Sequence, residues 1–268
     1  MPEGDTISRA AHTIARALEG KEVVRFRSPL PALADATLAG RSVVRVEPRG
    51  KHLLIHFDDG RVLHSHMRMT GSWHVYRPAE TWWKPERLAH AVIETADFVA
   101  VCFSAPVVEL LSAGGTARHP ALSRLGPDVL GEAFDPEGAR ARLRSMPDAP
   151  IGEALLAQRA LAGIGNIYKS EALFAARTNP FVPVGRLSDD EIDAVVRAAR
   201  RMMAASVASQ GSSRGRRAGA SGRPRYAVYL RSGQPCRVCG TAIRMRRQGD
   251  AGRSSYWCPE CQGGVGSR

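Results

Sequence analysis

The chain has 268 residues, which excludes a single tiny module and allows one to three domains. Lysine and arginine (38) outnumber aspartate and glutamate (26), so the net charge is +12 and the pI is near 10.2. This charge favours a polyanionic partner such as nucleic acid, although a merely basic soluble protein would share it. The sequence shows neither a long apolar stretch nor a signal peptide, which excludes a membrane protein and predicts a cytoplasmic location.

A helix is predicted over residues 6–19, with Asp5 or Thr6 as its N-cap and Gly20 as its terminator. Its apolar positions recur at helical spacing: Ile7, Ala11, Ile14 and Leu18. Short β-branched and apolar runs follow at 21–27, 42–47, 52–57, 61–67, 72–76, 90–95 and 98–103. Turn residues at 58–60 and 96–97 separate neighbouring runs. Residues 1–118 are therefore predicted to form an antiparallel β-sandwich or barrel with an N-terminal helix.

Helical patterns dominate the second predicted domain, residues 119–222, notably around 150–158 and over 188–208. Ser188 and Glu191 are spaced as a capping box, and Leu187 and Ile192 as a hydrophobic staple. Residues 210–224 are rich in Gly, Ser and Arg, which is typical of a flexible cationic linker. A small C-terminal domain, 223–268, completes an α+β chain.

Four cysteines in this last domain form two Cys-x2-Cys pairs, Cys236 with Cys239 and Cys258 with Cys261. Two such knuckles supply four thiolates at tetrahedral reach, which predicts one structural Zn²⁺ ion and a β-hairpin between the pairs. A redox pair and an iron–sulfur centre are the weaker alternatives. The hairpin carries basic residues that would meet phosphate or merely face water: Arg244, Arg246, Arg247 and Arg253. The fifth cysteine, Cys102, lies in an apolar strand pattern and is predicted to be core.

Two further segments, residues 161–174 and the N-terminal residues 1–6, suggest a phosphate site and a nucleophile. The run LAGIGNIYKSEALF, 161–174, places Gly163 and Gly165 before a helix start, where Asn166 could hold a phosphate, although ordinary turn chemistry explains the same pattern. The chain opens with MPEGDT. Removal of Met1 would leave Pro2 with a free secondary amine that can attack an aldehydic sugar carbon, and Glu3 beside it could move a proton.

Four segments together resemble a known family. MPEGDT at 1–6, RGKHLL at 49–54, LAGIGNIYKSEALF at 161–174 and RSSYWCPECQ at 253–262 are similar, in order, to signatures of the formamidopyrimidine-DNA glycosylase and endonuclease VIII family. The resemblance spans essentially the whole chain. It implies an N-terminal β-sandwich, a helix–two-turns–helix DNA-binding domain and a zinc-finger hairpin, in agreement with the elements predicted above.

The resemblance also implies a mechanism for base excision and strand cleavage. Pro2 would attack C1′ of the damaged nucleotide and form a Schiff base, and Glu3 would protonate the opening sugar. Lys51, otherwise a solvated strand-edge residue, would serve in β-elimination and contact a phosphate. Asn166 would hold another phosphate, and Arg253 would grip the phosphate beside the lesion and assist δ-elimination.

Three residues are assigned to DNA binding on weaker grounds. Arg124 matches a DNA-contacting arginine of the endonuclease VIII branch. Met69, with Arg68, occupies the family's void-filling position, where a wedge replaces the extruded base. The alternative for Met69 is an ordinary core position at a strand end.

The implied substrate is damaged double-stranded DNA, with single-stranded DNA as a further partner, and a monomer is expected. Residues 104–119 lack the Arg-x-Phe pair of the oxidised-purine enzymes, which favours the endonuclease VIII branch and oxidised pyrimidines such as thymine glycol. A DNA- or RNA-binding zinc-ribbon protein, a paralogue that binds abasic DNA without excising bases and an oxidised-purine glycosylase remain alternatives. Trp82 and Trp83 are expected to form a hydrophobic plug rather than touch DNA. No metal role is predicted for six histidines scattered without ligand spacing: His12, His52, His56, His64, His66 and His74.

Overall fold

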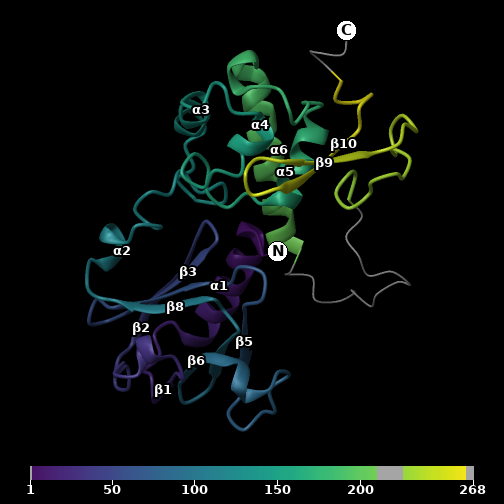
Figure 1. Cartoon of the computed structure of the whole chain (residues 1–268). Coiled ribbons are helices and arrows are strands. Elements are labelled where there is room, and N and C mark those ends of the chain that lie inside the picture. Colours follow the sequence, from purple (N-terminus) through teal and green to yellow (C-terminus); the bar gives the residue numbers. More distant parts are fainter. Residues whose placement is uncertain (1, 210–225, 264–268) are drawn as a thin grey trace. The chain divides into compact units, whose positions relative to one another are not determined.

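The computed structural model describes residues 2–209 and 226–263, and the chain divides into two compact units, Met1–Arg124 and Leu125–Arg268 (Figure 1). The predicted cationic linker, 210–224, lies outside the described residues. Each unit has a hydrophobic core of its own.

The N-terminal helix begins two residues earlier than predicted. Helix α1 spans Gly4–Leu18, and the carbonyl oxygen of Glu3 accepts hydrogen bonds from the amides of Thr6 (2.9 Å) and Ile7 (3.1 Å). The predicted N-caps are therefore wrong: Glu3 is the N-cap residue, and Asp5 instead pairs with Arg9 at 3.0 Å within the first turns. A carboxylate there is favoured by the helix dipole.

The first unit contains eight strands that form two four-stranded sheets with antiparallel pairing throughout. The strands are β1 Arg25–Arg27, β2 Val43–Arg49, β3 His52–Phe57, β4 Val62–His66, β5 Ser72–Tyr76, β6 Ala89–Glu94, β7 Val99–Phe103 and β8 Val107–Leu111. The sheet orders are β1-β6-β7-β5 and β2-β3-β4-β8. Short helices lie at η1 Pro31–Leu33, η2 Glu86–Leu88 and α2 Gly115–Arg118. The predicted β-sandwich with its N-terminal helix is confirmed.

The first core consists of side chains from the apolar face of α1 and from the inward-facing positions of the strands. Ile7 and Ile14 of α1 are each 1% exposed and belong to the same apolar cluster as Leu53 and Ile55 of β3 and Leu63 of β4. Cys102 of β7 is also fully buried in this cluster, as predicted, and burial raises the pKa of its thiol.

One predicted strand is shorter than expected, and one strand was not predicted. The run at 21–27 pairs as a strand only over β1, because Glu22 makes an isolated bridge to Ser42 and Val24 is 61% exposed. Strand β8 was not predicted. It is defined by its register against β4, with Glu109 opposite His64, and long-range pairing of this kind leaves only a weak local signal.

The second unit is helical up to Ala208. Its helices are α3 Pro136–Arg144, α4 Ile151–Ala154, α5 Asn166–Ala175, η3 Val184–Arg186 and α6 Asp189–Ala208. The helix predicted around 150–158 ends at Ala154 and is followed by turns at 155–156 and 158–160 before α5 begins. This arrangement is a helix–two-turns–helix. Within the described ranges, no helix is long and apolar enough to cross a membrane.

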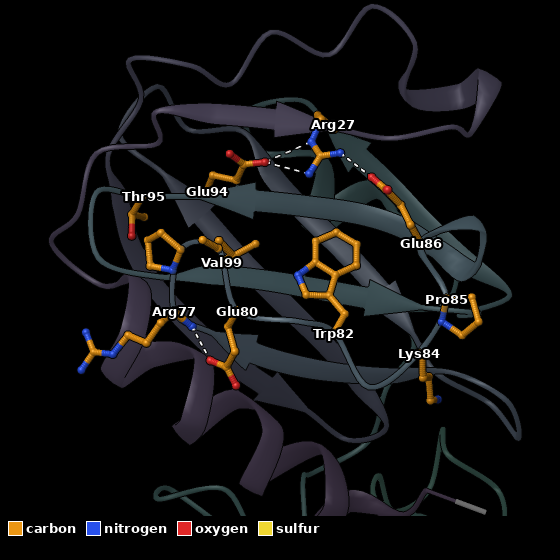
Figure 2. Close-up of a pocket in the computed structure, with 12 residues that line it drawn as sticks. Arg27, Arg77, Glu80, Trp82, Lys84, Pro85, Glu86, Glu94, Thr95 and Val99 are labelled. Atoms are coloured by element: carbon orange, nitrogen blue, oxygen red, sulfur yellow. Dashed lines mark hydrogen bonds and ion pairs between the residues drawn. The ribbon is translucent and has the colours of Figure 1, made fainter.

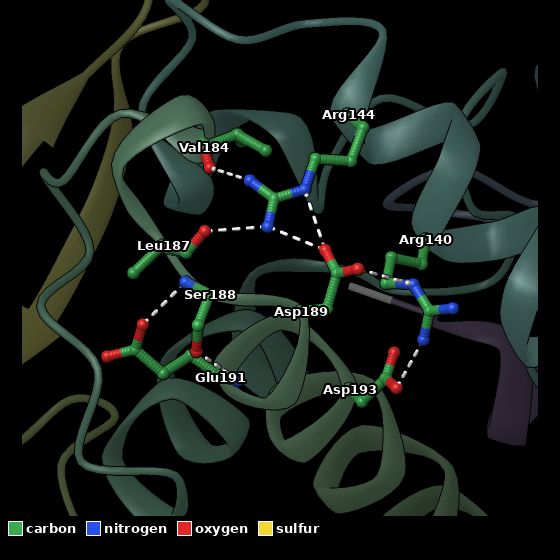
Figure 3. Close-up of polar contacts among 8 residues, drawn as sticks. All are labelled: Arg140, Arg144, Val184, Leu187, Ser188, Asp189, Glu191 and Asp193. Atoms are coloured by element: carbon green, nitrogen blue, oxygen red, sulfur yellow. Dashed lines mark hydrogen bonds and ion pairs between the residues drawn. The ribbon is translucent and has the colours of Figure 1, made fainter.

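Polar contacts fix the start of α6 (Figure 3). The predicted capping box is present: Ser188 N donates to the Glu191 carboxylate at 2.7 Å, and Glu191 N donates to Ser188 Oγ at 3.2 Å. Arg144 of α3 donates to Asp189 at 2.7 Å and to the carbonyl oxygen of Val184 at 2.9 Å. These contacts join α3 to the first turn of α6.

The predicted C-terminal hairpin is present as β9 Arg244–Gln248 and β10 Arg253–Trp257, an antiparallel pair. Two buried glutamines of this C-terminal region bind the segment that follows α5. Gln248 Nε2 donates to the carbonyl oxygen of Pro180 at 2.9 Å, and Gln262 Nε2 donates to that of Thr178 at 2.8 Å.

Candidate functional site

Pro2 and Glu3 stand side by side at the start of the first unit but differ in burial. Pro2 is half-buried, whereas the Glu3 residue is only 1% exposed. The carbonyl oxygen of Glu3 accepts the first hydrogen bonds of α1, which fixes the backbone of this residue at the helix start. A reactive group at Pro2 would thus adjoin a buried carboxyl group.

Lys51 lies in the tight turn between β2 and β3. Arg49 and His52 are register partners, so Gly50 and Lys51 form a two-residue hairpin loop. Gly50 has φ +61, a backbone conformation that glycine adopts without strain. Lys51 is half-buried at the tip of this hairpin.

The loop after β4 presents Met69. Met69 is 64% exposed while Met67 is 2% exposed, so the alternative reading of Met69 as a core residue is excluded. The loop closes through a hydrogen bond from Gly71 N to Met67 O at 2.8 Å. A Cβ at Gly71 would lie 2.7 Å from the Met67 backbone, so only glycine fits this closure. Arg68 has φ +45 and its amide donates to His66 Nδ1 at 3.1 Å.

The four cysteines predicted to bind zinc converge, and their sulfur atoms lie within 4.8 Å of one another. Cys236 Sγ and Cys261 Sγ are 3.9 Å apart, and Cys239 Sγ and Cys258 Sγ are 3.4 Å apart. Zn–S bonds of about 2.3 Å in a tetrahedron place sulfurs about 3.8 Å apart, so the donor set fits a structural Zn²⁺ ion. Hydrogen bonds from Thr241 lower the pKa of the Cys239 thiol, whereas burial raises the pKa of the Cys258 and Cys261 thiols.

Asn166 links the start of α5 to the zinc-finger hairpin. Its Nδ2 donates to the carbonyl oxygen of Ser254 at 2.8 Å, beside Arg253 at the beginning of β10. Its Oδ1 is buried without a hydrogen-bond partner among the described residues. Lys169, one turn further along α5, donates to the same carbonyl at 3.1 Å and to Ser255 Oγ at 2.7 Å. Arg253 itself is exposed.

Two further residues of α5, Lys169 and Glu171, bind the C-terminal part of the chain, and the sequence does not indicate their partners. Lys169 is 1% exposed, and an amphipathic pattern gives no sign of a lysine buried against a hairpin eighty residues away. Glu171 of α5 shares a helix face with Ile167 and Phe174, which leaves its partner undetermined from the sequence. Its carboxylate accepts hydrogen bonds from three successive backbone amides, those of Ala227 (2.8 Å), Val228 (2.9 Å) and Tyr229 (2.9 Å).

The predicted site residues divide between the units. The first unit holds Pro2, Glu3, Lys51, Arg68, Met69 and the exposed Arg124, and the second holds Asn166, Arg253 and the cysteines.

A separate pocket on the sheet β1-β6-β7-β5 contains none of these site residues (Figure 2). Trp82 lines it and packs edge-on against Phe103 as a plug, as expected, whereas Trp83 is 81% exposed and does not.

Comparison with known proteins identifies the chain. Models of the formamidopyrimidine-DNA glycosylase N-terminal domain, of its H2TH domain and of a zinc finger found in FPG and IleRS match residues 1–106, 125–217 and 233–263. A probable endonuclease 8 2 from Streptomyces coelicolor is 41% identical over 100% of this chain and 96% of its own length. The chain belongs to the formamidopyrimidine-DNA glycosylase family.

Other family members agree in sequence and in fold. The DNA-(apurinic or apyrimidinic site) lyase Nei2 from Mycolicibacterium smegmatis is 39% identical over 98% of this chain and 99% of its own. The crystal structure of MutM (Fpg) from Thermus thermophilus superposes with a TM-score of 0.79 at 32% identity, covering 98% of this chain and 99% of that one. The chain is therefore a bifunctional DNA glycosylase and abasic-site lyase of base excision repair with one structural zinc.

Proposed function

We propose that this family member excises oxidised pyrimidines from damaged duplex DNA with Pro2 as the nucleophile. The observation that carries the proposal is that a half-buried Pro2 and a buried Glu3 are adjacent at the start of α1. A carboxyl group next to an amine is placed to move a proton during the reaction.

The chemistry follows from the two groups. Once Met1 is removed, the Pro2 nitrogen forms a bond to C1′ and the bond from C1′ to the base breaks, and the departing base takes up the proton that the proline nitrogen loses. Glu3 protonates the sugar ring oxygen as the ring opens. The resulting iminium ion acidifies the C2′ proton. Loss of that proton expels the 3′ phosphate, and a second elimination expels the 5′ phosphate. Lys51 assists the first elimination, and Arg253 assists the second.

The remaining site residues bind DNA in this proposal. Arg253 and Arg124, both exposed, contact backbone phosphates. Asn166 has one amide N–H committed to Ser254, so its second N–H serves the phosphate. Met69, with Arg68, fills the gap left by the extruded base, which its exposure at the tip of a closed loop supports.

Preference for pyrimidines rests on two observations. Residues 104–119, which contain β8 and α2, lack an Arg-x-Phe pair. The probable endonuclease 8 2 of Streptomyces coelicolor is 41% identical, above the 37% of the formamidopyrimidine-DNA glycosylase of Bordetella pertussis, although the endonuclease 8 2 of Mycobacterium bovis is 36% identical. We further propose a cytoplasmic monomer that also accepts single-stranded DNA, with domains at 1–118, 119–222 and 223–268.

Cleavage of defined oligonucleotides tests the function. We expect the purified protein to nick duplexes that carry thymine glycol faster than duplexes that carry 8-oxoguanine, to leave uracil intact, and to cut preformed abasic sites. Faster cleavage at 8-oxoguanine would reverse the lesion preference. Cleavage of abasic sites without release of any oxidised base would instead identify an enzyme that has lost excision.

A further inference from the structure

A cluster of histidines and one glutamate lies on the sheet β2-β3-β4-β8, where sequence spacing gave no sign of a site. His64 of β4 and Glu109 of β8 are cross-strand partners, and His119 follows α2. His64 Nδ1 lies 2.7 Å from Glu109 Oε1, and His119 Nε2 lies 2.9 Å from the same oxygen. The three donor atoms are all within 4.8 Å of one another.

We propose that His64, Glu109 and His119 bind one divalent transition-metal ion, separate from the zinc held by the four cysteines. Two imidazoles and one carboxylate suit Zn²⁺, Co²⁺, Ni²⁺ or Cu²⁺, whereas Mg²⁺ and Ca²⁺ prefer sites made of oxygen alone. Ligand bonds of about 2.0–2.1 Å in a tetrahedron place donors about 3.3 Å apart. The observed contacts therefore need to widen by only about half an ångström around such an ion.

The surroundings of His64 match those of a metal-ligating histidine. Its other ring nitrogen, Nε2, lies 2.8 Å from Nδ1 of the buried His52. When His64 Nδ1 binds a metal, Nε2 carries the proton and donates to His52 Nδ1, an outer contact that fixes the ring and its tautomer. Each imidazole stays neutral, so the exchange of tautomers balances without net loss of a proton.

His119 must also exchange its tautomer for Nε2 to bind the metal. The amide of Leu122 lies 3.3 Å from His119 Nδ1 and also 3.1 Å from the His119 carbonyl oxygen. When Nε2 binds the metal and Nδ1 takes the proton, that amide keeps the carbonyl as its acceptor.

Burial leaves one side of the site open. The His64 side chain is 1% exposed, but those of Glu109 and His119 are 35% and 17% exposed. Three protein ligands and an open direction are the arrangement in which zinc keeps a water or another exchangeable ligand. An ion here would bind β4, β8 and the segment after α2 to one another, and would thereby stabilise the first unit.

Metal titration of the full chain, with the cysteine cluster already loaded with Zn²⁺, tests the site. We expect each chain to bind one Co²⁺ ion in addition to the Zn²⁺ held by the cysteines. The spectrum of this Co²⁺ should lack the thiolate-to-cobalt charge-transfer band that binding through cysteine would give. We also expect this Co²⁺ ion to raise the melting temperature of the first unit. Removal of an outer partner typically weakens a metal site about 10–100-fold, so loss of a direct ligand in His119→Ala or Glu109→Gln should weaken Co²⁺ binding by at least that factor.

His12→Ala provides the matched control, because His12 is exposed on α1 and its loss should leave binding of the additional Co²⁺ ion intact. Retention of the cysteine-bound zinc confirms in each variant that the second unit is folded, and circular dichroism confirms the first. Absence of an additional Co²⁺ ion, a thiolate-type Co²⁺ spectrum, or equal affinity in His119→Ala and His12→Ala would overturn the proposal.

Discussion

At the scale of single residues, Asn166 and Lys169 join α5 to β10, the strand that begins with Arg253. The sequence pattern predicted a phosphate role for Asn166 from its place at a helix start. It could not predict the bond to Ser254, because the partner is distant in the chain and its carbonyl carries no residue-specific signal. Lys169 was overlooked for the same reason.

Lys169→Met tests the link between α5 and the hairpin, because methionine keeps much of the side-chain volume of lysine but lacks its charge and its hydrogen-bond donors. Loss of the contacts to Ser254 and Ser255 should weaken hairpin docking by about 1–3 kcal/mol. Hydrogen exchange of the β9 and β10 amides should accelerate while zinc is retained. Lys21→Met, at an ion pair with Asp97 in the first unit, is the control and should leave this exchange unchanged.

Met69→Ala tests the wedge. Excision from duplex DNA should fall more than cleavage of single-stranded substrate, because only a duplex leaves a gap to fill. Val44→Ala is a matched control, since Val44 is 61% exposed on β2 and Met69 is 64% exposed. Equal losses on both substrates would count against a wedge.

At the scale of elements, the sequence predicted best what is encoded locally. The Ser188–Glu191 capping box, the start of α5 at Asn166 and the hairpin between the cysteine pairs were all found. Strand β8 and the cluster of His64, Glu109 and His119 were not predicted, since both depend on which strands become neighbours in the sheet. The difference in exposure between Pro2 and Glu3 was not predicted either, because sequence spacing does not show which of two adjacent residues is buried.

Removal of the structural zinc provides the test at this scale. Cys258→Ser should unfold the hairpin, because the small apolar cluster around Val228 and Ile243 cannot replace the free energy of thiolate coordination. The first unit should remain folded, as measured by its own thermal transition, and affinity for abasic DNA should fall. Wild-type DNA affinity in a zinc-free protein would refute this account.

At the scale of the whole molecule, the net charge of +12 predicts a DNA affinity that falls steeply with salt. Each lost phosphate contact lowers the slope of log affinity against log salt by about 1, so Arg253→Ala should flatten it by about that amount. Arg16→Ala is the control, because Arg16 is exposed in the last turn of α1, roughly 20 Å along the helix from Pro2. An identical slope in both variants would show that Arg253 does not contact phosphate.

The central claim is covalent catalysis by Pro2, and borohydride trapping tests it most directly. Borohydride should reduce the iminium ion to a stable amine that joins protein and DNA. We expect mass spectrometry of the digested adduct to place the DNA remnant on the peptide that begins Pro2-Glu3-Gly4, and we expect extension of the N-terminus by one residue to abolish trapping while lesion binding persists. A remnant on a peptide containing Lys51, or trapping that survives the extension, would contradict the account.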